Sequence, residues 1–219
     1  MVVRRRSERM LEYPARERWR RLRRDAPREE YFRVLREAVI EFYLADPSNP
    51  YQQSGRSSGA QRWEETRRLF VQAIHRSGDF LDVGCANGLL LDTLIVWARQ
   101  EGFTIRPHGI DLVPELVELA RERFPGRHDC FEVANAFHWT PKRQYDFVRT
   151  NVEYVPEPDW IPFIRRQHAA VTAGGRLIVS HYRNLDESEV DAGAVVERAG
   201  YPVSGRAAAP GVSVAWCQA

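Results

Sequence analysis

Apolar positions in the first 77 residues recur at helical spacing. Over residues 28–44 they return every three or four positions, which predicts an amphipathic helix. A second helix is predicted over about 60–77, and the Pro-, Ser-, Asn- and Gly-rich residues 46–59 are predicted to form a loop between the two. Residues 7–24 could form a further, highly charged helix that Pro14 interrupts.

After residue 78 short apolar runs alternate with amphipathic segments. Strands are predicted at 80–83, 104–110, 130–134, 145–150 and 176–181, with two more over 202–217 on either side of Pro210-Gly211. Helices are predicted at 88–100, 114–124, 159–172 and 186–199. Strands that alternate with helices are typical of a parallel α/β sheet covered on both faces, to which the tail hairpin adds an antiparallel edge.

Composition adds an asymmetry that the net charge of +2 conceals. Residues 1–28 hold eleven arginines and four acidic residues, a balance of +7, so the remaining 21 basic and 26 acidic residues amount to −5. Lys142 is the only lysine, which reflects either genomic base composition or phosphate recognition by arginine. No apolar run reaches membrane-spanning length, and no apolar stretch follows the first arginines, so we do not expect a secretory signal. Three widely spaced cysteines offer neither a disulfide framework nor paired zinc ligands, so a reduced cytoplasm is expected.

The segment FLDVGCANGLLL, residues 80–91, carries the clearest chemical signal. A buried strand enters a turn where Gly84 and Gly88 allow close approach of a ligand, and the following helix presents its first N–H groups. The next strand ends in Asp111, 23 residues after Gly88, where an acidic side chain can accept both hydroxyls of a ribose. Asp111 could also be the N-cap of the helix that begins at Pro114, and the two roles are compatible.

DVGCANG followed by GIDLVPELVELAR resembles motif I and the following acidic segment of class I S-adenosylmethionine-dependent methyltransferases. YDFVRTN resembles motif IV, AGGRLIVSHY resembles the fifth strand with its Gly-Gly turn, and the similarity covers roughly residues 78–217. The resemblance implies a Rossmann-like sheet of seven mostly parallel strands, with helices on both faces, an antiparallel last strand and a helical N-terminal cap. The expected organisation is an arginine-rich arm (1–27), a cap with a cofactor-closing loop (28–77) and a methyltransferase core (78–219).

The resemblance also implies S-adenosyl-L-methionine as cofactor. The glycine turn would hold its methionine part with Asp82 near the amino group, Asp111 would bind the ribose, and Asn135-Ala136 would contact the adenine. Residues 49–55 (NPYQQSG) either close over the cofactor or merely link two helices. The predicted cofactor-binding residues are Tyr51, Ser54, Gly55, Asp82, Gly84, Cys85, Ala86, Gly88, Asp111, Leu112, Asn135, Ala136 and Thr150.

Two positions depart from the family pattern. Ala86 replaces the middle glycine, which should leave the turn usable, and Asn135 replaces the commoner aspartate, although an amide can still accept a hydrogen bond from adenine. A dinucleotide-binding G-x-G-x-x-G would need glycine at residue 86, which disfavours that alternative.

Methyl transfer from a sulfonium depends mainly on positioning, and a base is needed only for a weakly nucleophilic acceptor. The candidates near the expected methyl group are Asn151, Glu153, Tyr154, His138 and His181, each of which could instead be structural. We rank His181 first as a base, because it ends the fifth predicted strand at the edge where ligand clefts lie, and Glu153 second. The predicted catalytic residues are therefore His181, Glu153 and Asn151, with no metal.

Three hypotheses remain open for what the protein does with the cofactor. The preferred one is a small-molecule acceptor beneath a helical lid. The second is rRNA or tRNA, gripped through the arginines of residues 4–28, although the motif for adenine-N6 methylation is absent after residue 149. The third is cofactor binding without catalysis, with the arm as a partner-binding or dimerisation segment. The oligomeric state stays unpredicted.

Overall fold

The computed structural model describes residues 13–22, 26–55, 59–182 and 190–219. Its centre is a seven-stranded sheet in the order β3-β2-β1-β4-β5-β7-β6. The strands are β1 (Gly78–Val83), β2 (Ile105–Asp111), β3 (Phe131–Val133), β4 (Tyr145–Asn151), β5 (Val171–Tyr182), β6 (Gly205–Ala209) and β7 (Val212–Gln218). The first five strands run parallel, and β7 is antiparallel to both β5 and β6. The predicted fold class is confirmed.

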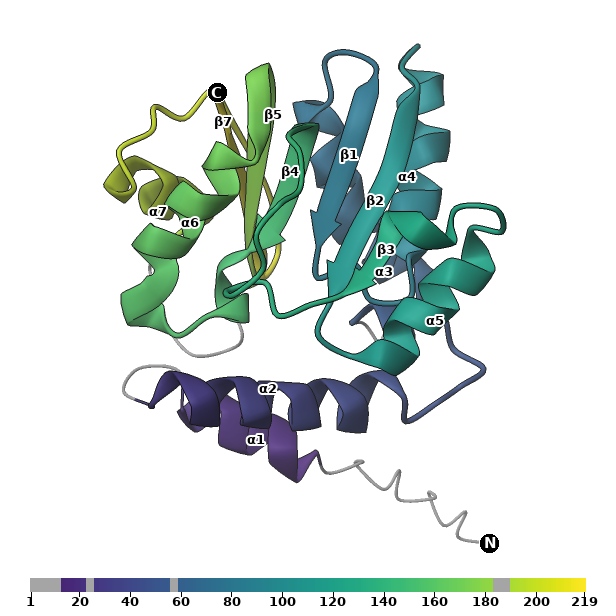
Figure 1. Cartoon of the computed structure of the whole chain (residues 1–219), viewed down its shortest axis with the longest axis vertical. Coiled ribbons are helices and arrows are strands. Elements are labelled where there is room, and N and C mark those ends of the chain that lie inside the picture. The colour runs from purple at the N-terminus through teal and green to yellow at the C-terminus, as the bar shows by residue number, and fades with distance from the viewer. Residues whose placement is uncertain (1–12, 23–25, 56–58, 183–189) are drawn as a thin grey trace, which may run out of the picture.

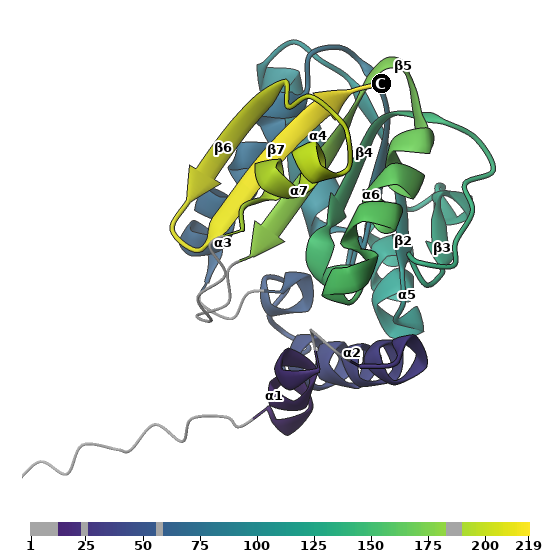
Figure 2. The same ribbon diagram turned by 90° about the vertical axis from the view of Figure 1, so that its left-hand side faces the viewer.

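Helices cover both faces of the sheet (Figures 1 and 2). On one face lie α3 (Ala60–Arg67), α4 (Leu89–Gln100) and α5 (Pro114–Arg123), which share an apolar core with the 3-10 segment η2 (Arg68–Ala73). On the other face lie α6 (Trp160–Ala169) and α7 (Ala192–Arg198). Short 3-10 turns complete the chain: η1 (Gln52–Ser54), η3 (His128–Cys130), η4 (Val152–Tyr154) and η5 (Glu157–Asp159).

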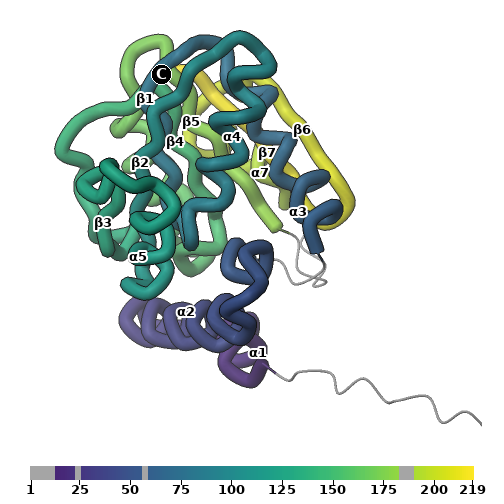
Figure 3. The backbone as a smooth tube through the Cα atoms, turned by 90° about the vertical axis from the view of Figure 1, so that its right-hand side faces the viewer, coloured from purple at the N-terminus to yellow at the C-terminus, as the bar shows by residue number. Residues whose placement is uncertain are grey.

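The N-terminal helices α1 (Pro14–Arg21) and α2 (Arg28–Tyr43) lie together across the end of the sheet where β1, β2 and β4 finish (Figures 1 and 3). Side-chain hydrogen bonds of two residues help to attach α2 to the core. The Tyr31 hydroxyl donates to the Glu153 carbonyl at 2.8 Å, and the Arg28 guanidinium donates to both oxygens of Asp159 at 2.7 and 2.6 Å. The cap therefore covers the carboxyl ends of the parallel strands, where α/β folds place their ligands.

Several details of the predicted elements are wrong. The helix predicted at 159–172 ends at Ala169, and residues 171 and 172 belong to β5. The helix predicted at 186–199 begins at Ala192, with residues 186–189 outside the described part. Pro14 begins α1 instead of interrupting it, because a first-turn residue needs no backbone N–H; residues 7–12 and 23–24 of that predicted helix lie outside the described part. The helix predicted at 60–77 becomes 3-10 after Arg67, a common way for a helix to finish. Strand β5 begins at Val171, five residues early, since the register shifts opposite β4 and Gly175 lets the chains approach closely there.

Candidate cofactor and acceptor site

The glycine turn between β1 and α4 is held by backbone hydrogen bonds to the neighbouring strand. The N–H groups of Gly84 and Cys85 both donate to the Ile110 carbonyl, at 2.8 and 2.9 Å. Gly84 and Gly88 adopt positive φ angles of 82° and 74°, as a tight turn requires. Ala86 also has a positive φ, 49°, alone among the described non-glycine residues, so it carries the backbone strain that the family glycine would avoid.

Asp111 joins this turn to the end of β2. Its Oδ2 accepts the Ala86 N–H at 2.9 Å, and its Oδ1 accepts the Val113 N–H at 3.0 Å. Burial raises the pKa of Asp111, while these backbone N–H groups oppose the rise. The N-cap of α5 is Val113, so the expectation that Asp111 caps this helix is wrong. The carboxylate is instead oriented by the two segments that the resemblance assigns to the cofactor.

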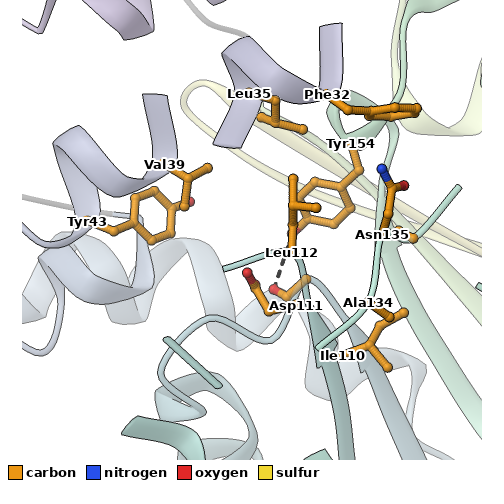
Figure 4. A pocket seen from close by; sticks show the side chains of 12 residues that line it. Phe32, Leu35, Val39, Tyr43, Ile110, Asp111, Leu112, Ala134, Asn135 and Tyr154 are labelled. Atoms are coloured by element: carbon orange, nitrogen blue, oxygen red, sulfur yellow. Dashed lines mark hydrogen bonds between the residues drawn. The ribbon is translucent and has the colours of Figure 1, made fainter. Parts of the chain in front are cut away.

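A pocket of about 520 Å³, its opening to solvent included, lies beside Asp111. Five predicted cofactor residues line it: Gly84, Asp111, Leu112, Asn135 and Ala136. Figure 4 shows Phe32, Leu35, Val39 and Tyr43 of α2 facing Ile110 and Asp111 across this space. The helical cap thus forms one wall of the pocket and the strand ends form the other.

Asn135 is held in place by its own turn. Its Oδ1 accepts the Phe137 N–H at 2.9 Å, and its carbonyl accepts the N–H groups of His138 and Trp139. His138 packs against Phe32 and Phe137, with ring centroids 5.6 and 5.2 Å away. This turn places Asn135 on the pocket wall and gives His138 a packing role.

A buried ion pair lies beneath the turn and was missed in the sequence. Asp82 and Arg149 are 1% and 3% exposed, and Arg149 Nη1 is 3.1 Å from Asp82 Oδ1. Arg149 also donates to Ser180 Oγ at 3.0 Å and to the Tyr154 hydroxyl at 3.3 Å. Burial raises the pKa of Asp82 to about 6, against the opposing charge of Arg149. The available signal was a lone arginine in a strand that is otherwise buried.

Tyr154 stands between this pocket and a second one. Its hydroxyl donates to the Gly84 carbonyl at 3.3 Å, and its ring lies so close that a Cβ on Gly84 would meet it at 2.3 Å. The second pocket, about 640 Å³ with its opening, shares Leu35, Val39, Tyr43 and Tyr154 with the first. Its remaining lining comes from α1, α2 and the ends of β4 and β5: Arg16, Trp19, Ala38, Phe42, Asn151, Glu153 and Tyr182.

The predicted catalytic residues lie at different depths around the second pocket. Asn151 and Glu153 line it, whereas His181 lines neither pocket and is 2% exposed. His181 Nδ1 is 2.9 Å from the Val190 carbonyl, and its Nε2 is 3.5 Å from Glu153 Oε1, which also accepts the Tyr182 N–H at 2.7 Å. His181 therefore lies behind the pocket wall, where it contacts one of the lining residues, Glu153.

The loop 49–55 contacts the glycine turn, but not in the predicted way. The Tyr51 ring packs edge-on against Trp63, with centroids 5.8 Å apart, and the Ser54 and Gly55 N–H groups donate within their own 3-10 turn. The link is Asn87, also missed in the sequence, whose Nδ2 donates to the Pro50 carbonyl at 3.0 Å and to Gln53 Oε1 at 3.3 Å.

The other predicted cofactor residues stand behind the pocket wall. Thr150 is fully buried in β4, and Cys85 is 2% exposed and packs against Gly109. Gly88 packs against Ala120 and Phe124 of α5. These three residues position the strands and the turn, and none of them lines either pocket. Asp82 and Ala86, which were also predicted to bind the cofactor, are buried and line neither pocket.

Comparisons with known proteins agree with this geometry. Residues 56–203, more than half of the chain, match the family model described as a methyltransferase domain, so the chain belongs to this family. Two curated relatives are named trans-aconitate 2-methyltransferase, from Rhodopseudomonas palustris strains BisB18 and BisB5. The first is 34% identical over 106 residues (48% of this chain, 39% of the relative) and the second 30% identical over 128 residues (58% and 48%). The chain spans less than half the length of these relatives.

Solved structures share the fold at low sequence identity. The N-methyltransferase NodS from Bradyrhizobium japonicum WM9, in complex with S-adenosyl-l-homocysteine, superposes with a TM-score of 0.59 at 16% identity, over 84% of this chain and 97% of NodS. A SAM-dependent methyltransferase from Aquifex aeolicus superposes with a TM-score of 0.55 at 19% identity, over 78% and 97%. The family resemblance drawn from the glycine turn is therefore confirmed. Within the described residues no helix is both long and apolar enough to cross a membrane.

Proposed function

We propose that this chain is an S-adenosylmethionine-dependent methyltransferase that methylates a small molecule. The first pocket would hold the cofactor, with Asp111 on its ribose and Asn135 beside its adenine. The second pocket would hold the acceptor, and Tyr154 would stand where the two ligands meet. The observation that carries this proposal is the shared wall: both pockets open at the carboxyl ends of the parallel strands and have Leu35, Val39, Tyr43 and Tyr154 in common.

The fit of the cofactor can be judged on this chain's own residues. A cofactor with a cationic amino group and a ribose fits a site with two acidic groups, and Asp82 and Asp111 are buried at the carboxyl ends of the adjacent strands β1 and β2. Because Gly84 has no Cβ, the Tyr154 ring can pack directly against the turn; a Cβ at this position would collide with that ring. In the complex the chain's part would be to bind and orient both ligands and to exclude water, while the cofactor supplies the activated methyl group.

The arm supports a small acceptor over RNA. Two of the four arginines described in the arm pair with protein carboxylates, Arg18 with Glu37 and Arg20 with Glu17, and Arg28 at the start of the cap pairs with Asp159. Curated relatives carry the name of an enzyme that acts on trans-aconitate, a small molecule.

We also propose that the chain is organised as an arm (1–27), a cap (28–77) and a core (78–219). A cytoplasmic location is proposed as well, and it is supported by the free thiols of Cys85, Cys130 and Cys217.

The test is to incubate the protein with methyl-labelled S-adenosylmethionine and either a set of small carboxylic acids, amines and phenols or total rRNA and tRNA. We expect label in a small molecule and background label in RNA. Label confined to RNA, in a reaction that weakens steeply with salt, would establish the second candidate. Cofactor binding without transfer to any acceptor would establish a non-catalytic binding protein.

A further inference from the structure

Arg16 is a charged residue of the second pocket that the proposed function does not yet use. Arg16 and Trp19 are three residues apart on α1, so they lie on one helix face, and both line the pocket. The Arg16 guanidinium lies 4.3 Å from the centroid of the Phe42 ring. Unlike Arg18, Arg20 and Arg28, it forms no ion pair with any described carboxylate. A partly buried cation that has no ion-pair partner can bind an anion that enters the pocket.

The position of Arg16 is fixed by the backbone of α1. The N–H groups of Ala15 and Arg16, in the first turn of this helix, donate to Glu41 Oε2 of α2 at 3.0 and 3.3 Å. Carboxylates bind favourably at a helix N-terminus, where the N–H groups lack partners within the helix. Glu41 therefore holds α1 against α2, and these two hydrogen bonds fix the helix that places Arg16 in the pocket lining.

The other charged residue of the lining, Glu153, already has protein partners for its carboxylate. Glu153 Oε1 accepts the Tyr182 N–H at 2.7 Å and lies 3.5 Å from His181 Nε2. The Tyr182 hydroxyl, by contrast, is buried with no hydrogen-bond partner among the described residues, and the Arg67 guanidinium lies 4.6 Å from the centroid of its ring. The lining thus offers an anion the Arg16 guanidinium, its one cationic group, beside polar side chains that include Asn151 and Tyr182 and among apolar residues such as Leu35, Val39 and Phe42.

Building on the proposed function, we propose that the acceptor is a small carboxylic acid, held through a carboxylate by Arg16, and that the methyl group is transferred to a carboxylate oxygen. A carboxylate is ionised near neutral pH, so this acceptor needs no base, in keeping with the engagement of Glu153 and the burial of His181. An oxygen lone pair forms the new bond to the methyl carbon, and the electron pair of the breaking C–S bond returns to sulfur. The products are a methyl ester and the neutral thioether, and no proton moves. Because an anion and a sulfonium become two neutral molecules, the apolar walls of the pocket favour the step.

The experiment compares wild type with Arg16→Met and with Arg21→Met, a matched control on the exposed end of the same helix. Each protein receives methyl-labelled cofactor and a panel of small mono- and dicarboxylic acids, the corresponding amides, and amines. We expect wild type to methylate acids and not amides. Arg16→Met should raise the KM for the acid at least tenfold, with cofactor affinity within twofold of wild type, and Arg21→Met should match wild type.

The outcomes separate this inference from the function on which it rests. An unchanged KM in Arg16→Met, or methylation of amines or amides alone, would overturn the inference and leave the methyltransferase proposal intact. Cofactor binding with no transfer to any acceptor, or transfer to RNA alone, would instead refute the proposed function. If Arg16→Met fails to fold, two other results test the inference. The first is the comparison of acids with amides in wild type. The second is the KM of Arg16→Lys for the acid, which should exceed that of wild type because lysine lacks the guanidinium fork.

Discussion

The two pockets of this site are held together by different kinds of interaction. The first rests largely on backbone groups: the N–H groups of the turn at Gly84 donate to the Ile110 carbonyl at the end of β2, and the Asp111 carboxylate accepts two further backbone N–H groups. The second rests on side chains from distant parts of the sequence, with Arg16 of α1 facing a pocket that also has Glu153 and Tyr182 in its lining. The strand-end wall of the first pocket is therefore fixed by the core of the sheet, whereas its opposite wall and most of the second pocket depend on how the cap is attached.

This difference separates the determinants of chemistry from those of acceptor choice. A turn between adjacent parallel strands can hold one cofactor whatever covers it, because its geometry is set by the sheet. The cap can change its side chains without disturbing that turn, so acceptor selection belongs to α1 and α2. The predictions below probe the two regions in turn.

The largest effect is expected in the core region, from Arg149→Met. The variant leaves the carboxylate of Asp82 buried without its partner, which should lower the free energy of unfolding by about 3–5 kcal/mol in urea denaturation. Arg20→Met, which removes an exposed pair with Glu17, should cost no more than about 1 kcal/mol. Equal stability losses in the two variants would show that the ion pair beneath the turn is not a structural element of the cofactor pocket.

The charge of Asp82 should make cofactor binding depend on pH. Its pKa is raised to about 6, so the carboxylate, which we expect to attract the cofactor's amino group, forms only as the pH rises through that value. Affinity for S-adenosylmethionine should increase about tenfold between pH 5 and pH 7 in calorimetric titrations. Asp82→Asn should bind more weakly and without this dependence, and the same slope in that variant would assign the titration to another group.

A smaller effect is expected in the cap, from Glu41→Ala. The change removes the acceptor of two N–H groups in the first turn of α1 and should destabilise this helix locally by about 1 kcal/mol. Hydrogen exchange should accelerate about fivefold over residues 13–22 and remain unchanged over β1 and the glycine turn. Glu30→Ala, on the exposed side of α2, is the control. Faster exchange in the glycine turn would show that the two regions are coupled.

The fold was predictable because its elements follow local patterns. The helix at 28–44 and the strand ending at Val83 have the periodicities of amphipathic and buried elements, and both are found within one or two residues of their predicted positions. Errors occurred where tertiary contacts decide. Strand β5 extends through Gly174 and Gly175 because β4 accommodates a register shift, which periodicity in one segment does not encode.

The site was predictable to the extent that it follows from backbone geometry. Gly84 and Asp111 lie at the first pocket because a turn after one parallel strand and the end of its neighbour must meet at one edge of the sheet. Arg149, Asn87 and Arg16 were missed because their roles come from partners 34 or more positions away, or from a pocket that exists only once the cap is folded. The rank given to His181 likewise ignored the depth of its burial.

The central claim, that the backbone-built pocket holds S-adenosylmethionine, is tested most directly by calorimetry on Asp111→Ala. Wild type should bind the cofactor, and the variant should bind it at least tenfold more weakly, a loss of about 1.4 kcal/mol. Glu115→Ala, a nearby exposed carboxylate at the start of α5, should bind like wild type, and circular dichroism should show that both variants are folded. Unchanged affinity in folded Asp111→Ala would contradict the assignment of this pocket to the cofactor.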